Sequence, residues 1–308
     1  MKKEHYWLGS CPYCSAPYTV HEEHLGCFKH CNLCKGALKT GCTYTSDGMD
    51  YIALLPDLTG ESFVKDGCTV ENGVLTRVEL TGDTVEIPSG VIAIGANAFQ
   101  GMKSLKKVIF PESVIYIGEK AFYDCEGIRD LALPSGLIAM GNFAFSQCRR
   151  IVSVKIPSSL KYAGYSIFQG CDNLTELCLP MDMEFLGGSP YRYCKKLKKA
   201  TVPNCVTDTT YWFSGLDSLE EIVLGKGVGN CDGIPLEKMK SVTFVKKTGW
   251  CTKKGYGDEA VLLDPSELES PKSAALLLYR LKKSKATLSR TDFDPLSRFD
   301  IFLKPNVE

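Results

Sequence analysis

The chain has 308 residues, of which 44% are apolar, and this composition is typical of a folded rather than a disordered chain. Lysine plus arginine equals aspartate plus glutamate at 36 each, so the overall charge gives no attraction toward nucleic acid or an anionic membrane. No apolar run approaches the roughly 18 residues of a membrane-spanning helix, and the first residues lack the apolar stretch of a signal peptide. These features predict a cytoplasmic protein without a membrane span.

Residues 1–55 predict a small zinc-binding domain. Cys11 and Cys14 form one CxxC pair, and Cys31 and Cys34 form a second pair after 16 intervening residues. Two tight turns of this kind aim four thiolates at one ion, and zinc supplies about 10–16 kcal/mol of folding free energy to a segment too short for its own core. The segment resembles zinc ribbons in its two knuckles, and the resemblance implies a structural zinc ion.

Of three other interpretations of this segment, the first stays open and the last two are disfavoured by the sequence. Cys27 or His30 can replace one thiolate ligand without changing the fold. Cys11-Pro-Tyr-Cys14 is also the sequence of a glutaredoxin active site, but only ten residues precede it and no βαβ pattern follows. His21 and His24 are three residues apart, whereas a zinc protease helix needs a spacing of four. His30 is the last histidine of the chain, so the repeats contain no histidine general base.

Residues 56–84 predict a joint and an N-terminal cap for the domain that follows. The stretch 51–55 is apolar enough to end the zinc domain as a strand, and 56–60 is rich in turn-forming residues. We expect the stretch 70–80 to form a hairpin that covers the open end of the next sheet, because an uncovered terminal strand invites association.

Residues 85–250 repeat with a period of 23 residues. A proline recurs at this interval without a slip: Pro88, Pro111, Pro134, Pro157, Pro180 and Pro203. An aromatic residue and a cysteine keep the same phase: Phe99, Phe122, Phe145, Phe168 and Tyr191; Cys125, Cys148, Cys171 and Cys194. A fixed period in the twenties is typical of a solenoid, in which each unit buries its apolar side only by stacking on its neighbours.

Each repeat contains a short strand that the proline ends. Apolar residues alternate with others before each proline, and we expect eight strands from Val85/Ile87 to Val242/Phe244. One strand per coil, always in the same direction, predicts one parallel sheet about 34 Å long from seven spacings of about 4.8 Å. Turn glycines follow in phase: Gly95, Gly118, Gly141, Gly164 and Gly187.

These repeats resemble the BspA-like class of leucine-rich repeats. Ile87-Pro88, Ile117-Gly118, Ala121-Phe122 and Cys125 fit its pattern, and the match covers more than half of the chain. The resemblance implies a right-handed solenoid used for binding, in a family associated with surface adhesion, and no catalytic residues. Ser189-Pro190 and Thr209-Thr210 depart from the pattern, after which the period shortens.

The chain contains 15 cysteines, an odd number without the spacing of a disulfide-stapled fold. The four in-phase cysteines of the repeats are therefore expected to be free, buried and equivalent to small apolar residues. Reduced thiols also agree with a cytoplasmic protein.

Residues 251–308 predict a helical cap or appendage. Asp264-Pro265 and Ser270-Pro271 each combine an N-cap with a proline at the first helical position. Two apolar stripes at helical spacing follow: Leu277, Leu278 and Leu281, and then Leu296, Phe299 and Phe302.

The side chains that point outward from the predicted strands indicate what class of partner the sheet binds. Their mixed charge suits a protein surface and argues against a small-molecule substrate. The residues that we expect to contact a protein partner are Lys107, Asp130, Lys155, Glu176, Lys199 and Glu221.

A basic cluster supports a second interpretation. Five cations with two tyrosines occupy one repeat, and such a mixture can bind a phosphate backbone and stack on bases. The cations are Arg192, Lys195, Lys196, Lys198 and Lys199. The sequence thus predicts first a non-enzymatic protein-interaction scaffold and second a nucleic-acid-associated protein that uses the zinc ribbon and this cluster.

Overall fold

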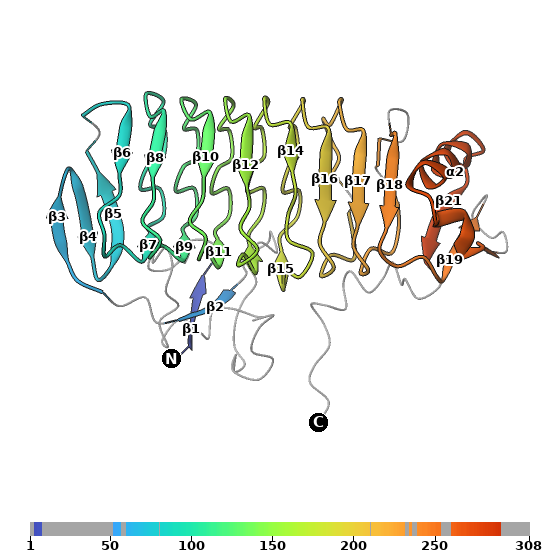
Figure 1. Ribbon diagram of the computed structural model, residues 1–308, viewed down its shortest axis with the longest axis horizontal. Coiled ribbons are helices and arrows are strands. Elements are labelled where there is room, and N and C mark those ends of the chain that lie inside the picture. The colour runs from blue at the N-terminus through green and yellow to red at the C-terminus, as the bar shows by residue number, and fades with distance from the viewer. Residues whose placement is uncertain are drawn as a thin grey trace, which may run out of the picture.

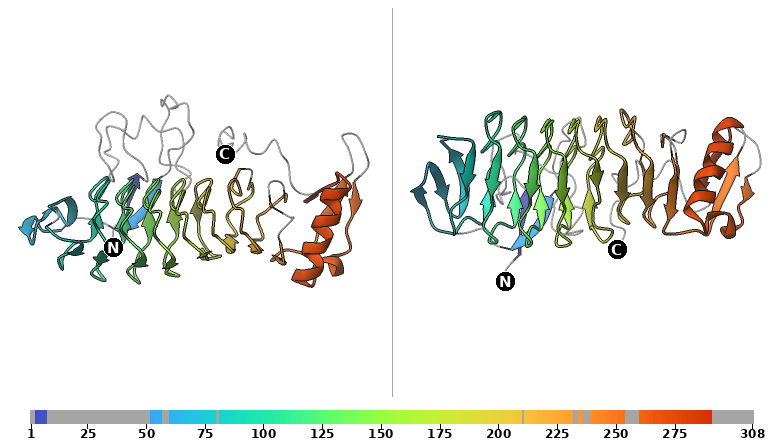
Figure 2. Two further views of the ribbon diagram at one scale, coloured as in Figure 1. Left: turned by 90° about the horizontal axis from the view of Figure 1, so that it is seen from above. Right: turned by 45° about the horizontal axis from the view of Figure 1, so that its top comes forward.

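The chain is an elongated stack of coils with a cap at each end (Figures 1 and 2). This computed structural model describes residues 3–7, 52–56, 60–79, 81–209, 211–231, 234–235, 239–253 and 260–290, with the backbone alone for the first two ranges. The sites predicted at Cys11, Cys14, Cys31 and Cys34, with Cys27 and His30, lie outside the described residues.

Sheet 1 is the row of eight short parallel strands that the sequence predicts. Its strands, in order, are β6 (Thr84–Glu86), β8 (Lys107–Ile109), β10 (Asp130–Ala132), β12 (Ser153–Lys155), β14 (Glu176–Leu177), β16 (Lys199–Val202), β17 (Glu221–Leu224) and β18 (Ser241–Phe244). The strands are hydrogen-bonded as β6–β8, β10–β12 and β14–β16–β17–β18. Inward side chains such as Val108 and Leu131 are buried, which confirms the predicted alternation.

A second sheet, sheet 2, lies on the opposite side of the coils, where the sequence analysis predicted none. Five of its strands have two residues each: β7 (Ala93–Ile94), β9 (Tyr116–Ile117), β11 (Ala139–Met140), β13 (Tyr162–Ala163) and β15 (Phe185–Leu186). They pair in parallel, one coil to the next. Strands of two residues are too short to produce a visible alternation in the sequence.

The predicted N-terminal hairpin is present but joins sheet 2. β3 (Phe63–Lys65), β4 (Cys68–Glu71) and β5 (Val74–Val78) pair antiparallel, and β5 then pairs in parallel with β7. The turns Asp66-Gly67 and Asn72-Gly73 have positive φ at both positions, as tight hairpin turns require. The hairpin therefore extends sheet 2, and β6 remains the terminal strand of sheet 1.

The phased aromatic residues stack along the core. The ring centroids of Phe99 and Phe122 lie 4.5 Å apart, those of Phe122 and Phe145 4.9 Å apart, and those of Phe145 and Phe168 5.4 Å apart. The four in-phase cysteines are free and buried, which confirms the prediction. Burial raises the pKa of the Cys125 and Cys194 thiols to about 12, so these groups stay protonated at neutral pH.

The coils become shorter toward the C-terminus. Glu176 lies opposite Lys199, which keeps the interval of the phased prolines, but Lys199 lies opposite Glu221 and Glu221 opposite Ser241. Each of the last two intervals is shorter than the one before it. Phe213 falls early in the repeat, as expected, and is still buried.

The described part of the C-terminal cap contains one α-helix and a small sheet that was not predicted. β19 (Trp250–Lys253) pairs antiparallel with β20 (Val261–Leu262) and β21 (Thr287–Arg290). The 3-10 helix η1 (Pro265–Leu268) and the helix α2 (Pro271–Lys283) begin at the predicted caps Asp264 and Ser270. The second predicted stripe, at Leu296, Phe299 and Phe302, lies outside the described residues.

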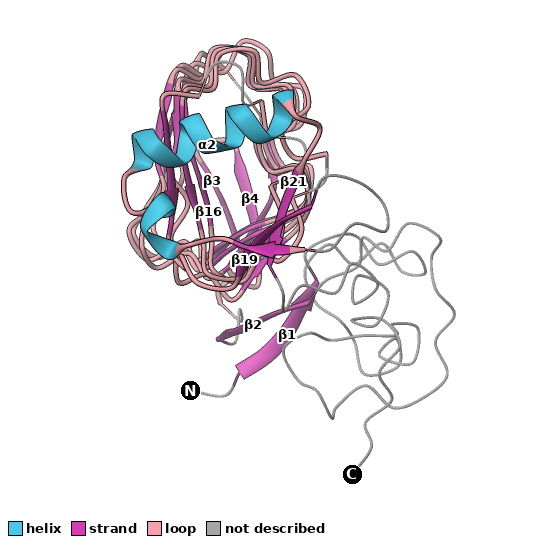
Figure 3. Cartoon of the chain, turned by 90° about the vertical axis from the view of Figure 1, so that its right-hand side faces the viewer, coloured by secondary structure: helices cyan, strands magenta, loops and turns pink. Residues whose placement is uncertain are grey.

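Helix α2 lies across the end of the stack and contacts β18 (Figure 3). Its buried side chains are Ala274, Ala275 and Leu278, and two leucines of the predicted stripe, Leu277 and Leu281, pack against the core. Within the part of the chain that the structure describes, no helix has the length and apolarity needed to cross a membrane.

Near the N-terminus, β1 (Lys3–Trp7) pairs antiparallel with β2 (Ile52–Pro56). The strand predicted at the end of the first segment is therefore present. The pairing brings Trp7 opposite Ile52 and so joins the two ends of the intervening segment.

Candidate interaction surface

The outer face of sheet 1 presents two columns of side chains, because alternate strand residues point away from the core. In the strand register, the first column is Thr84, Lys107, Asp130, Ser153, Glu176, Lys199, Glu221 and Ser241. The second column is Glu86, Ile109, Ala132, Lys155, Cys178, Thr201, Val223 and Thr243.

The six predicted contact residues all lie on this face. Five belong to the first column, and Lys155 belongs to the second. All are exposed except Lys199, which is partly exposed. The face is therefore a continuous row of polar groups of both signs, with an exposed apolar side chain at Ile109.

Charges on this face interact between neighbouring coils. The Lys199 ammonium lies 3.3 Å from a carboxylate oxygen of Glu176, and this hydrogen bond raises the pKa of Lys199. Partial burial and then the Glu176 carboxylate raise the pKa of the Cys178 thiol to about 11. Cys178 is thus protonated at neutral pH, unlike a nucleophilic cysteine.

The face contains no recognisable catalytic set. No group of three or more histidine, cysteine, aspartate or glutamate side chains suited to a metal ion occurs among the described residues. The chain has no histidine after His30.

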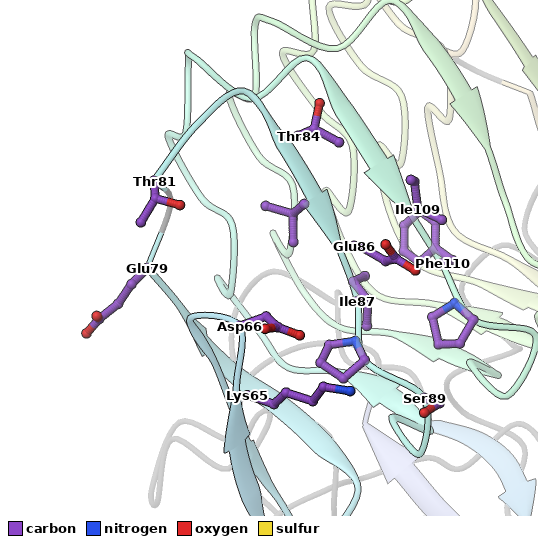
Figure 4. Close-up of a pocket in the computed structure, with 13 residues that line it drawn as sticks. Lys65, Asp66, Glu79, Thr81, Thr84, Glu86, Ile87, Ser89, Ile109 and Phe110 are labelled. Atoms are coloured by element: carbon purple, nitrogen blue, oxygen red, sulfur yellow. The ribbon is translucent and has the colours of Figure 1, made fainter.

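A groove of about 490 Å³ lies at the N-terminal end of the face, beside the terminal strand β6 (Figure 4). One wall is formed by β6 and the two residues after it, Ile87 and Pro88, and the other includes Lys65 and Asp66 in the turn between β3 and β4. This groove could not be predicted from the sequence, because it forms only when the hairpin joins sheet 2 and leaves β6 uncovered. Its charged lining residues are Lys65, Asp66, Glu79 and Glu86.

The side chains of the predicted basic cluster are separated from one another, and acidic residues neutralise part of their charge. Lys195 lies 3.4 Å from Asp172 and Lys196 donates to Asn173 over 2.7 Å, both on the preceding coil. The Arg192 guanidinium lies over the Tyr193 ring at 4.7 Å. Lys198 is exposed, and Lys199 pairs with Glu176 on sheet 1. The cluster is therefore not one uniform positive patch.

Comparison with known families accounts for this architecture. The family model for the BspA type leucine-rich repeat region matches residues 78–198 and 117–233, with six copies of the repeat. The two matches together span residues 78–233, which is 156 of the 308 residues. The chain belongs to the BspA-type leucine-rich repeat family. The family resemblance of the repeats is thereby confirmed.

Several solved structures are similar to this BspA-type chain. A leucine-rich repeat protein from Bacteroides ovatus is 29% identical, with a TM-score of 0.47 over 57% of this chain and 48% of that one. The leucine-rich repeat protein of T. pallidum is 26% identical, with a TM-score of 0.46 over 55% of this chain and 85% of that one. The comparison with curated proteins gives no match. This chain therefore spans less than half of the Bacteroides ovatus chain.

The BspA-type repeat tolerates its departures by keeping the backbone bend. Asn97, Lys120, Phe143 and Ser166 are in phase, and each has a positive φ. Ser189, where the sequence departs from the pattern, continues this series with a φ of 58°. The change of residue type therefore preserves the turn that stacks the coils.

Proposed function

We propose that the chain is a non-enzymatic scaffold that binds a protein partner through the outer face of sheet 1. The observation that supports this function most directly is the row of polar side chains over the eight strands of sheet 1, which includes exposed charges of both signs such as Lys107 and Asp130. Leucine-rich repeat proteins are generally interaction scaffolds, which agrees with the family of this chain.

The order of charges favours a partner with a matching pattern. Along the first column, Lys107 is followed by Asp130, Glu176, Lys199 and Glu221. This fixed order of two positive and three negative charges favours one alignment of a partner over others, because like charges that face each other repel. We expect a protein surface with charges of both signs, and no small-molecule substrate.

Charge reversal on the face tests the proposal. The double variant Lys107→Glu/Lys155→Glu changes both columns, and the matched control Lys272→Glu/Lys285→Glu makes the same change on the C-terminal cap. Each protein is immobilised and incubated with extract from the native cell, and bound proteins are compared by mass spectrometry. We expect the face variant alone to lose proteins that the wild type retains. Identical captured proteins from the face variant and the wild type would contradict a role for sheet 1.

We further propose a structural zinc ribbon in residues 1–55, held by Cys11, Cys14, Cys31 and Cys34. The CxxC spacing supports it, and so does the pairing of β1 with β2, which joins the ends of the segment that carries the cysteines. Cys27 or His30 remains an alternative ligand. A cytoplasmic location, suggested by the free buried thiols of the repeats, is part of the same proposal.

The alternative function is association with nucleic acid through the ribbon and the basic cluster. Lys195 and Lys199 are paired with acidic residues, which weakens the attraction for phosphate, whereas Lys198 is exposed. Retention on DNA or RNA that falls steeply with salt would favour this alternative over the scaffold.

A further inference from the structure

The outer side of sheet 2 carries an apolar cluster that is separate from the core of the coils. Its buried members are Val74, Ala93, Tyr116, Ala139 and Tyr162, and its partly buried members are Ile92, Ile115, Ile138 and Phe185. Tyr116 is 0% exposed and Tyr162 is 6% exposed. Side chains on the outer face of a sheet reach such values only when another layer covers them.

The cluster runs along sheet 2 from β5 to its last strand, β15, but one of its rows ends earlier. The position held by Ile92, Ile115 and Ile138 becomes Lys161 and then Glu184 in the next two coils. The apolar face therefore extends over six neighbouring strands, from β5 to β15, and five spacings of about 4.8 Å give a length of about 24 Å. Sheet 1 has no such band, because its outer columns are mostly polar.

The N-terminal segment is tethered next to this face. Only residues 57–62 separate β2 from β3, and six residues span at most about 22 Å. β3 is the terminal strand of sheet 2, two strands away from β5. The pair β1–β2 lies on the sheet 2 side of the stack in the side and end views (Figures 1 and 3).

The size of the segment fits the face. Residues 8–51, between β1 and β2, number 44. A compact domain of this size has a radius of gyration of about 9 Å and thus a diameter near 24 Å. This diameter matches the length of the apolar band.

We propose that residues 8–51 dock as a compact unit on the apolar face of sheet 2. The tether, the matching dimensions and the burial of Tyr116 and Tyr162 lead to this assignment. Docking there holds the N-terminal segment against the first coils and leaves sheet 1 free for a partner. The two faces of the stack then have separate roles.

Two matched variants of the full chain test the docking. Ile115→Asp places a charge in the apolar face, and Ile109→Asp makes the same change on sheet 1 in the preceding strand, β8. Hydrogen exchange is followed by mass spectrometry in peptides from residues 8–51 and from β8 and β10. We expect Ile115→Asp to speed exchange in residues 8–51 at least tenfold, with β8 and β10 unchanged, and Ile109→Asp to have no such effect. Equal exchange of residues 8–51 in the wild type and both variants would overturn the docking.

Cross-linking of the unmodified chain gives a second test that does not depend on a variant folding. Lys29, Lys35 and Lys39 lie in the segment, Lys161 borders the apolar face, and Lys107 and Lys155 lie on sheet 1. We expect intramolecular links from the segment to Lys161 and none to Lys107 or Lys155. Links to the sheet 1 lysines would overturn the proposal. A wild-type dimer that Ile115→Asp dissociates would also overturn it, because a second copy would then be the occupant.

Discussion

The Cys148 thiol donates a hydrogen bond to the carbonyl oxygen of Phe122, 3.0 Å away on the preceding coil. The same contact joins Cys125 to Phe99, Cys171 to Phe145 and Cys194 to Phe168, at 2.9, 3.3 and 3.1 Å. Each buried thiol thus connects two coils through the backbone of the aromatic residue. The repeat cysteines are hydrogen-bond donors as well as small apolar residues.

This row of buried, hydrogen-bonded thiols predicts that the protein loses stability at alkaline pH. Burial raises the thiol pKa of Cys148 and Cys171 well above 9.0, and that of Cys125 and Cys194 to about 12. Below about pH 9 the thiols are protonated in both states, and the free energy of unfolding is unaffected. Between pH 9 and the folded-state pKa, only the unfolded chain loses these protons, so stability falls by about 1.4 kcal/mol per thiol and pH unit.

Urea unfolding at pH 7.5, 8.5, 9.5 and 10.5 measures this effect. Cys148→Ala is the control, because it removes one thiol while the other titrating groups remain. We expect its stability to be lower at neutral pH but to decline less steeply above pH 9. Parallel pH profiles for the two proteins would contradict the assigned shift.

The turn glycines predict a second, steric effect. A Cβ on Gly118 would lie 2.7 Å from the Ala96 nitrogen and 2.9 Å from the Gly95 carbonyl carbon, in the backbone of the preceding coil. Gly118→Ala should therefore push two coils apart and destabilise the array by about 1–3 kcal/mol. Gly82 has no atom within 4 Å of the same position, and Gly82→Ala should change stability by less than about 0.5 kcal/mol. Thermal unfolding of both variants makes the comparison, and equal losses would refute close stacking as the reason for the glycine.

The C-terminal helix predicts a change in association. Ala274 is 0% exposed on the side of α2 that faces the core, whereas Leu276 on the same helix is 50% exposed. Ala274→Asp would bury an unpaired charge at a cost of about 3–5 kcal/mol and should detach α2 from β18. The exposed edge of β18 should then promote self-association.

Light scattering and hydrogen exchange of residues 271–283 detect both consequences. Leu276→Asp is the matched control and should remain like the wild type. If Ala274→Asp stays monomeric and its helix still exchanges slowly, then α2 is not what prevents association through β18.

The proposed ribbon predicts one zinc ion per chain. Elemental analysis of the purified protein should give this ratio, and Cys34→Ser should lose the metal because one thiolate ligand is removed. Cys178→Ser, on sheet 1, should keep it. A metal-free wild type with Cys11 and Cys14 joined in a disulfide would instead favour a redox role for this segment.

The sequence was sufficient for features that repeat in phase. The same residue types recur at a fixed interval in each repeat. This recurrence predicted the strands of sheet 1, the stacked phenylalanines and the buried cysteines. The outward positions such as Lys107 and Asp130 follow from alternation within those strands. Most of the candidate surface was therefore predictable residue by residue.

Features formed by single, distant contacts were not predictable. The pairing of Trp250 with Arg290 joins residues far apart in the chain, and no repeated sequence pattern predicts it. The groove beside β6 exists because the turn at Asp66 belongs to the other sheet. Sheet 2 was not predicted because two-residue strands such as Ala93–Ile94 are too short to show an alternation of apolar and polar residues.

The two ends of sheet 1 differ in whether another element covers the terminal strand. β18 abuts helix α2, whereas β6 is the last strand in its ladder and borders an open groove. A strand from another molecule that lengthened this sheet would thus meet a blocked terminus at one end and an available one at the other. Any such growth would use the β6 end alone, which permits a single added strand or a pair joined through their two β6 strands, but not a head-to-tail chain of subunits.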